Sequence, residues 1–95
     1  MSKTLIIPND GSLYFDTISE FKQSINWGAE IEFIWNDTTY EAIRYGTNNK
    51  ITIYEEDKPE TEKVCDTADD ALEYRVGEDR LRNVITKVTV LSRTI

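Results

Sequence analysis

Two glutamates, Glu30 and Glu32, stand two residues apart in the run EIEFIW. A pair of carboxylates at a suitable separation can serve as the acid and the nucleophile or base of a glycosidase. The alternation of the glutamates with Ile31, Phe33 and Trp35 indicates a strand, which places both carboxylates on the side opposite Phe33. A chain of 95 residues is too short to build a carbohydrate cleft, so we interpret the pair as a solvated strand face.

Few other residues could do chemistry. The sequence has no histidine, the commonest general base and metal ligand. Its one cysteine, Cys65, therefore has no histidine to activate it as a nucleophile, and the acidic neighbours of Cys65 are expected to raise the pKa of its thiol. We interpret Cys65 as a small packing residue. A zinc site needs a cluster of Cys and His, which this sequence lacks. The four glycines are isolated, so no glycine-rich phosphate-binding loop is present. DTADDALE lacks the glycine and the distal glutamate of an EF-hand calcium loop. This inventory predicts a protein that is not an enzyme and needs no cofactor or metal.

The remaining feature is charge. Residues 55–79 hold eleven acidic and three basic residues, whereas the rest of the chain holds seven acidic and eight basic ones. The net charge of −7 therefore resides in about a quarter of the chain. Direct binding of nucleic acid is disfavoured, because phosphate contacts need Lys and Arg. An anionic membrane surface or another acidic partner is disfavoured for the same reason.

Four of these acids have helical spacing. Asp66, Asp69, Asp70 and Glu73 recur at i, i+3, i+4 and i+7, so on a helix they form one row about 10 Å long. The row is either a solvated face, favoured by the dipole at the helix start, or an imitation of the phosphate backbone. Like charges on a helix repel only weakly, so reversing all four is expected to leave thermal stability unchanged.

The candidate partner-binding residues are the acids of the segment 55–73 and two tyrosines near the turn GTNNK. Tyrosines anchor many interfaces, although they also cap the edges of cores with a polar tip in water. The set is Glu55, Glu56, Asp57, Glu60, Glu62, Asp66, Asp69, Asp70, Glu73, Tyr45 and Tyr54.

The elements that must position these residues begin with strands. KTLII predicts a strand at 3–7, closed by a proline and the turn NDG. Thr17 and Glu20 have the spacing of a capping box, which predicts a helix over 17–26 that ends before Gly28. Residues 30–56 alternate in period two and contain two turns, which predicts a three-stranded antiparallel meander. In its middle strand, either Tyr40 and Ala42 or Ile43 and Tyr45 face the core.

The second half of the chain favours helices. DKPETEK is expected to be a polar loop, because Pro59 opposes a continuing strand. A helix is predicted at 67–75, ending near Gly77; a short helix follows in EDRLRNVITK and a last strand in KVTVL. We therefore predict a single α+β domain over 1–95: a small, mostly antiparallel sheet containing the meander, with two or three helices packed on one face. Phe15, Phe21, Phe33 and Trp35 are expected in its core.

The runs FKQSINWGAEIEFIWNDTTY and GEDRLRNVITKVTV resemble a loose family of small, mostly uncharacterised proteins of Gram-positive bacteria and their phages. The resemblance covers residues 21–90, with Asn36-Asp37 in place of the family's usual Asn-Gly turn. It implies a fold and a phage or host origin, and no activity. The positions that match its pattern are Gly28, Glu30, Ile31, Glu32, Phe33, Tyr40, Gly77, Leu81 and Val84.

Together these features favour a cytoplasmic binding protein. One cysteine suits a reducing compartment, the N-terminus lacks a signal-peptide core, and no apolar run is long enough to span a bilayer. The leading hypothesis is a phage or mobile-element inhibitor that mimics DNA and occupies the groove of a basic nucleic-acid-binding protein. A CRISPR effector nuclease is the most concrete partner, because anti-CRISPR proteins are similarly small and acidic. The alternatives are an immunity or antitoxin-like partner of a single toxin, or a housekeeping regulatory binding subunit.

Overall fold

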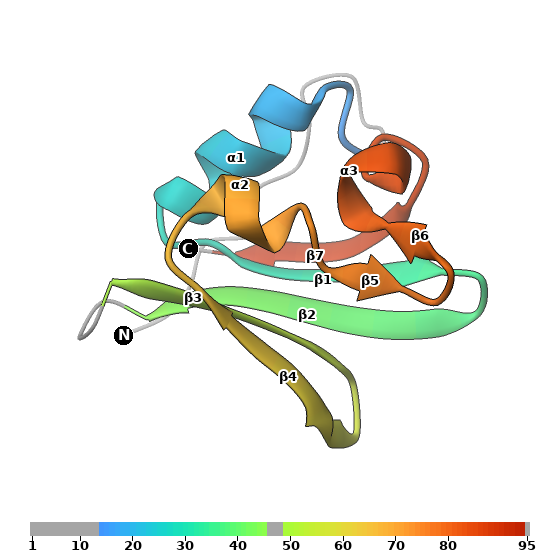
Figure 1. Cartoon of the computed structure of the whole chain (residues 1–95). Helices are drawn as coiled ribbons and strands as arrows, with labels where there is room; N and C mark the ends of the chain where they lie inside the picture. The colour runs from blue at the N-terminus through green and yellow to red at the C-terminus, as the bar shows by residue number, and fades with distance from the viewer. Residues whose placement is uncertain (1–13, 46–48, 95) are drawn as a thin grey trace.

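The computed structural model describes residues 14–45 and 49–94 of the chain. The strand predicted at 3–7 lies outside these residues. The described part is an α+β fold in which short helices pack on a five-stranded antiparallel sheet (Figure 1). The predicted fold class is therefore confirmed.

The first helix, α1, spans Ile18–Asn26, close to the predicted range. Its N-cap is Thr17, whose hydroxyl oxygen accepts a hydrogen bond from the backbone N–H of Glu20 at 3.1 Å. The carboxylate of Glu20 accepts in turn from the N–H of Asp16 at 3.2 Å, so the helix start is capped in both directions. After the helix, Gly28 has a φ of 88°, a conformation that glycine adopts without steric cost.

The middle of the sheet is the predicted meander of β1 (Glu30–Trp35), β2 (Thr38–Tyr45) and β3 (Lys50–Glu55). Beyond β3 lies β4 (Lys58–Cys65), and on the other edge, beside β1, lies β7 (Thr89–Thr94), the predicted last strand. The strand order is β4-β3-β2-β1-β7, and every neighbouring pair is antiparallel.

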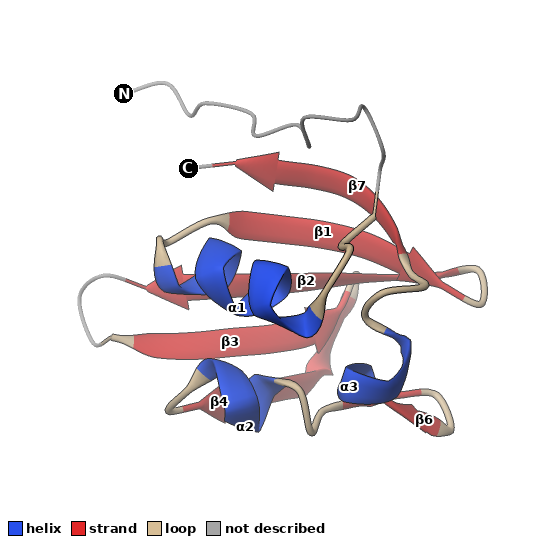
Figure 2. Ribbon diagram, turned by 90° about the horizontal axis from the view of Figure 1, so that it is seen from above, coloured by secondary structure: helices blue, strands red, loops and turns tan. Residues whose placement is uncertain are grey.

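The helices cover one face of the sheet (Figure 2), and the hydrophobic core lies between the helices and that face. Phe33 on β1 stacks on Tyr40 with ring centroids 5.4 Å apart, and Ala42 is fully buried. Tyr40 and Ala42 therefore face the core, which decides the alternative that the sequence left open. Trp35 is only partly buried, and its indole N–H donates to Asp79 at 3.1 Å. We call the side of the sheet turned away from the helices the open face.

The strand β4 corrects the loop predicted for DKPETEK. It pairs with β3, and its register shifts between Ile53 and Glu55, which is typical of a β-bulge. Proline is tolerated on an edge strand, because one row of N–H groups there has no partner strand. Pro59 near the start of the edge strand β4 is therefore compatible with strand structure. The alternation signal was missing because most β4 side chains are exposed.

The predicted helix over 67–75 is also wrong in its length. The helix α2 spans only Ala68–Ala71, although Thr67 caps it as expected. Its continuation is prevented because the carbonyl of Leu72 accepts a hydrogen bond from Arg82 instead of from the next helical turn. The chain then forms a hairpin of β5 (Arg75–Val76) and β6 (Asp79–Arg80), turning at Gly77 with a φ of 74°, before α3 (Leu81–Val84). No helix among the described residues is long and apolar enough to cross a membrane.

Candidate functional site

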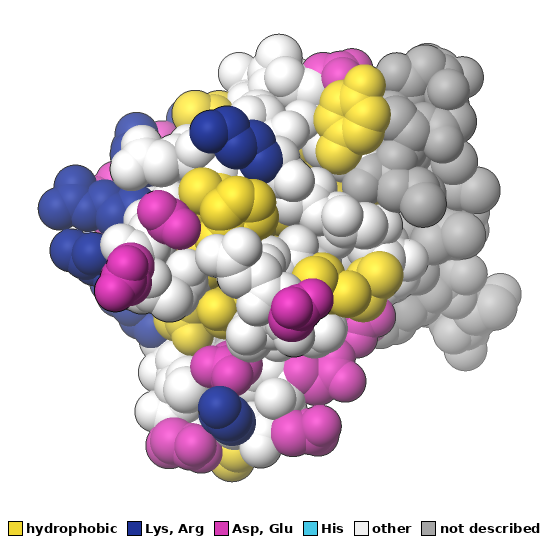
Figure 3. Space-filling view, turned by 90° about the vertical axis from the view of Figure 1, so that its right-hand side faces the viewer, with side chains coloured by type: hydrophobic (Ala, Val, Ile, Leu, Met, Phe, Trp, Pro, Cys, Tyr) yellow, Lys and Arg dark blue, Asp and Glu magenta, His cyan; other side chains and the backbone are white. Residues whose placement is uncertain are grey.

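The acidic segment 55–73 does not form one surface in the fold. Its first part lies at the end of β3 and along β4, and its second part follows β4 through α2. Figure 3 shows acidic side chains gathered at the lower end of one side of the molecule, where the β3–β4 hairpin ends in Figure 1. The two parts have different electrostatic surroundings, and we describe them in turn.

Most acids around α2 are paired with basic residues of the same chain. Asp69 lies 3.0 Å from the amine of Lys22 on α1, and Asp66 pairs with Lys50 on β3. Each of these pairs joins residues that are far apart in the sequence, so the sequence pattern could not reveal them.

Glu73 has two basic partners. Its carboxylate lies 3.5 Å from the guanidinium of Arg80 and also pairs with Arg82. Asp70 is exposed, and its backbone N–H donates to the hydroxyl of Thr67. Because α2 has only four residues, the prediction that the four acids share one helical face is wrong.

Most acids of the β3–β4 hairpin have no such ion pair with any base in the part of the chain that the structure describes. Glu55 is the exception, since it lies 3.0 Å from the amine of Lys58. Asp57 occupies the turn with a φ of 65°, and Glu60 and Glu62 are exposed on β4. This part of the predicted site therefore retains its negative charge.

The open face brings further glutamates next to this hairpin. Glu32 on β1 lies directly opposite Glu41 on β2, although like charges at opposed positions destabilise a sheet. The hydroxyl of Tyr54 donates to the carboxylate of Glu41 at 2.5 Å, which ties this predicted tyrosine to the cluster. A hydrogen bond shared with Glu56, burial, and the charges of Glu56 and Glu41 raise the pKa of Glu32 above its ordinary value.

Most bases of the sheet lie on its helix-covered side. Lys50 is the exception, because it lies on the same side of β3 as Tyr54, and it pairs with Asp66. Arg93 contacts Glu20 of α1, and Arg44 donates to the carbonyl of Asn26 at the end of α1, so both lie on the helix-covered side. Lys63 lies opposite the core residue Ile53 and is on that side as well. Within residues 14–45 and 49–94, no ion pair joins a base to four glutamates on or beside the open face, Glu32, Glu41, Glu56 and Glu62.

Apolar side chains accompany these glutamates on the open face. Ile34 and Ile43 are half-buried, and Val64 is 56% exposed. A surface of carboxylates with a few apolar contacts suits the binding of another protein, because interfaces combine an apolar centre with polar surroundings.

The chain matches no protein-family model, no curated protein and no solved structure. Among the described residues, no group of three or more Cys, Asp or Glu side chains is arranged to hold a metal ion. Cys65 is buried, as expected of a packing residue, and burial raises the pKa of its thiol.

Sequence reasoning missed Glu41 and undervalued Glu32. The signal was available: once Tyr40 and Ala42 face the core, Glu41 must share a face with Glu32. Tyr45 ends β2, but its side chain and the turn after it lie outside the described residues.

Proposed function

We propose that this protein is a non-enzymatic binding protein whose open face docks on a basic surface of a partner protein in the cytoplasm. The observation that supports this proposal is the sorting of charge between the two faces of the sheet. Arg44, Lys63 and Arg93 lie on the helix-covered side, and Lys50, on the other side of β3, pairs with Asp66. Glu32, Glu41 and Glu62 lie on the face that no described helix covers.

The partner surface is of the kind that normally holds nucleic acid. Such grooves are lined with Lys and Arg and attract closely spaced negative charges. Neighbouring strands lie about 4.8 Å apart, so carboxylates on adjacent strands can be spaced closely enough to meet several bases at once. In this proposal the protein inhibits its partner by covering the groove, and a CRISPR effector nuclease is one protein of that class.

The apolar residues of the open face favour a second candidate, an immunity or antitoxin-like partner of a single toxin. Ile34, Ile43 and Val64 would then form the centre of the interface and the glutamates its rim. The two candidates differ in their response to salt. Binding that rests on exposed charges weakens steeply as ionic strength rises, because charges are screened within about 8 Å at physiological salt.

Two variants with the same change in charge test the proposal. One neutralises the open face with E32Q, E41Q, E56Q and E62Q, and the other neutralises the α2 region with D66N, D69N, D70N and E73Q. Both are used beside the wild type as baits for proteins in a lysate of the native host, and retained partners are tested for displacement by duplex DNA.

The expected result is a partner that the wild type and the α2 variant retain, that the open-face variant loses, and that DNA displaces. A partner that DNA does not displace and that salt affects little would favour the immunity-like candidate. Retention of the same partner by the open-face variant with unchanged affinity would contradict both candidates and place the interface elsewhere.

A further inference from the structure

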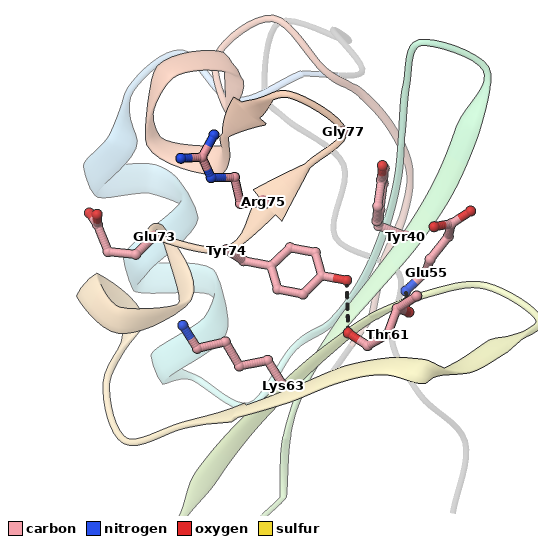
Figure 4. A pocket seen from close by; sticks show the side chains of 8 residues that line it. All are labelled: Tyr40, Glu55, Thr61, Lys63, Glu73, Tyr74, Arg75 and Gly77. Atoms are coloured by element: carbon pink, nitrogen blue, oxygen red, sulfur yellow. Dashed lines mark hydrogen bonds between the residues drawn. The ribbon is translucent and has the colours of Figure 1, made fainter.

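A groove on the helix-covered side of the sheet contains two basic side chains, Lys63 and Arg75, beside two acidic ones, Glu55 and Glu73. It has a volume of about 390 Å³ and lies between β4, the start of the β5–β6 hairpin and the ends of β2 and β3 (Figure 4). Grooves of roughly 300 to 1,000 Å³ are typical of sites for small molecules. Its lining residues are Tyr40, Glu55, Thr61, Lys63, Glu73, Tyr74, Arg75 and Gly77.

The two basic side chains that line this groove, Lys63 and Arg75, have no ion pair among the described residues. Glu73 is shared between Arg80 and Arg82, so one carboxylate serves two guanidinium groups. Arg75 donates only to the backbone carbonyl of Glu78, at 3.1 Å, and Lys63 has no ion pair within residues 14–45 and 49–94. Figure 3 shows several basic side chains along one side of the view, with acidic side chains beside them.

The hairpin itself places like charges together. Arg75 and Arg80 are directly opposed in the pairing of β5 with β6, an arrangement that costs stability unless an anion lies nearby. Arginine forks match the oxygens of a carboxylate or a phosphate, and Glu73 already occupies such a position between Arg80 and Arg82. The free positions are those of Arg75 and Lys63. Figure 4 shows their charged ends turned toward the Glu73 side of the groove, away from Glu55.

The rest of the groove is less polar. Tyr74 and Tyr40 supply aromatic carbon along it, with ring centroids 6.2 Å apart. Burial raises the pKa of both phenols, and the hydroxyl of Tyr74 donates to the carbonyl of Thr61 at 3.0 Å, which holds its ring in place. Gly77 has open space where a side chain would stand, so the wall of the groove is low at the hairpin turn.

We infer that this groove binds a small molecule that carries a carboxylate or phosphate group beside a flat apolar ring. The anionic group lies between Lys63 and Arg75, and the ring lies against Tyr74. A long polyanion is a poor fit, because the groove is short and Glu55 lines its other end. The site is separate from the open face, since Lys63 and Glu62 are adjacent on β4 and alternate between its two sides.

Titrations with phenyl phosphate, benzoate and inorganic phosphate, followed through backbone amide signals, test the inference. We expect saturable shifts at Thr61, Tyr74 and Gly77, with phenyl phosphate and benzoate binding more tightly than inorganic phosphate because of the ring. The difference between the first two probes identifies the preferred anionic group. Gly28, which lies at the end of α1, should not shift.

Three variants decide whether the named residues hold the anion. The double variant K63A with R75A should weaken the binding of phenyl phosphate about tenfold, because charge-assisted hydrogen bonds are lost. K87A removes an exposed charge outside the groove and should leave the affinity unchanged. E73Q frees Arg80 and Arg82 and should strengthen binding, a gain that a folding defect could not mimic.

Equal weakening by K87A and by the double variant would reduce the effect to net charge and overturn the inference. Absence of saturable shifts with all three probes, or binding of duplex DNA alone, would overturn it as well.

Discussion

The two parts of the acidic segment are both rich in acidic residues and differ in their electrostatic surroundings. Around α2, Asp66, Asp69 and Glu73 are each held by bases from elsewhere in the chain. Along the β3–β4 hairpin, Glu60 and Glu62 are exposed without such pairs among the described residues. A run of charge in a sequence therefore shows where acids are plentiful, and the fold decides which of them can meet a partner.

The difference follows from the neighbours that each part acquires. The segment around α2 packs beside α1 and before the arginine-rich hairpin, so its acids meet Lys22, Arg80 and Arg82. β4 lies at the edge of the sheet, where one side has no neighbouring strand. Acids on such an edge also discourage pairing with other chains, a role that needs no partner protein. Experiments that change one part and not the other can separate these roles.

The largest expected effect concerns the sheet that supports both parts. Phe33 is fully buried and stacks on Tyr40 directly behind the open face. Truncation in F33A should lower the free energy of unfolding by about 3 to 5 kcal/mol, the usual range for a buried aromatic. Urea denaturation measures the change. The control is I34A, which truncates the neighbouring residue on the open face and should lower the free energy of unfolding clearly less. An equal loss of stability in the two variants would show that the assigned faces are reversed.

The extent of correct prediction follows the strength of the local signals. Capping at Thr17, the positive φ of Gly28 and the meander were predictable because each depends on a few neighbouring residues. β4 was missed because an edge strand with mostly exposed side chains lacks alternation. The length of α2 depends on the hydrogen bond from Arg82 to Leu72, ten residues away, which no local pattern contains.

The candidate site was predictable in part for the same reason. The acids of the hairpin were named from composition alone, and Tyr54 joins them through its hydrogen bond to Glu41. The pairing of the α2 acids was not predictable, because Lys22 and Lys50 are far from them in the sequence and Arg80 approaches Glu73 only through the β5–β6 hairpin. Glu32 and Glu41 needed the register of β1 with β2, which the sequence left undecided.

The second effect, of intermediate size, compares the two parts directly. Reversing Asp66, Asp69, Asp70 and Glu73 to lysine places new positive charges beside Lys50, Lys22, Arg80 and Arg82. Exposed ion pairs contribute roughly 0.2 to 1 kcal/mol each, so we expect a loss of about 1 to 2 kcal/mol, where the sequence alone predicted none.

The matched comparison is the open-face variant with E32Q, E41Q, E56Q and E62Q, which breaks no ion pair among the described residues. It should unfold at the same or a slightly higher urea concentration than the wild type. Equal stability of the wild type and the lysine variant would show that the ion pairs around α2 contribute nothing.

The smallest effect concerns a single carboxyl on the open face and depends on pH. Hydrogen bonding with Glu56, burial and nearby negative charge raise the pKa of Glu32 in the folded protein above its ordinary value of 4.5. A group with a raised folded pKa contributes stability below its unfolded pKa and loses that contribution as the pH rises through the folded pKa. Glu32 therefore disfavours folding at neutral pH, in proportion to its charge.

We expect E32Q to unfold like the wild type near pH 3.5 and to be more stable by about 0.5 kcal/mol at pH 7, because it removes the opposed charge beside Glu41. Paired urea titrations at the two pH values measure the difference. E60Q removes one exposed charge from β4 and should show a smaller change between the same pH values. A gain for E32Q that is the same at both pH values would mean that repulsion within the open-face cluster does not govern Glu32. The retention of such repulsion in the folded protein is what a surface selected for a basic partner would require, since a base from that partner would relieve it.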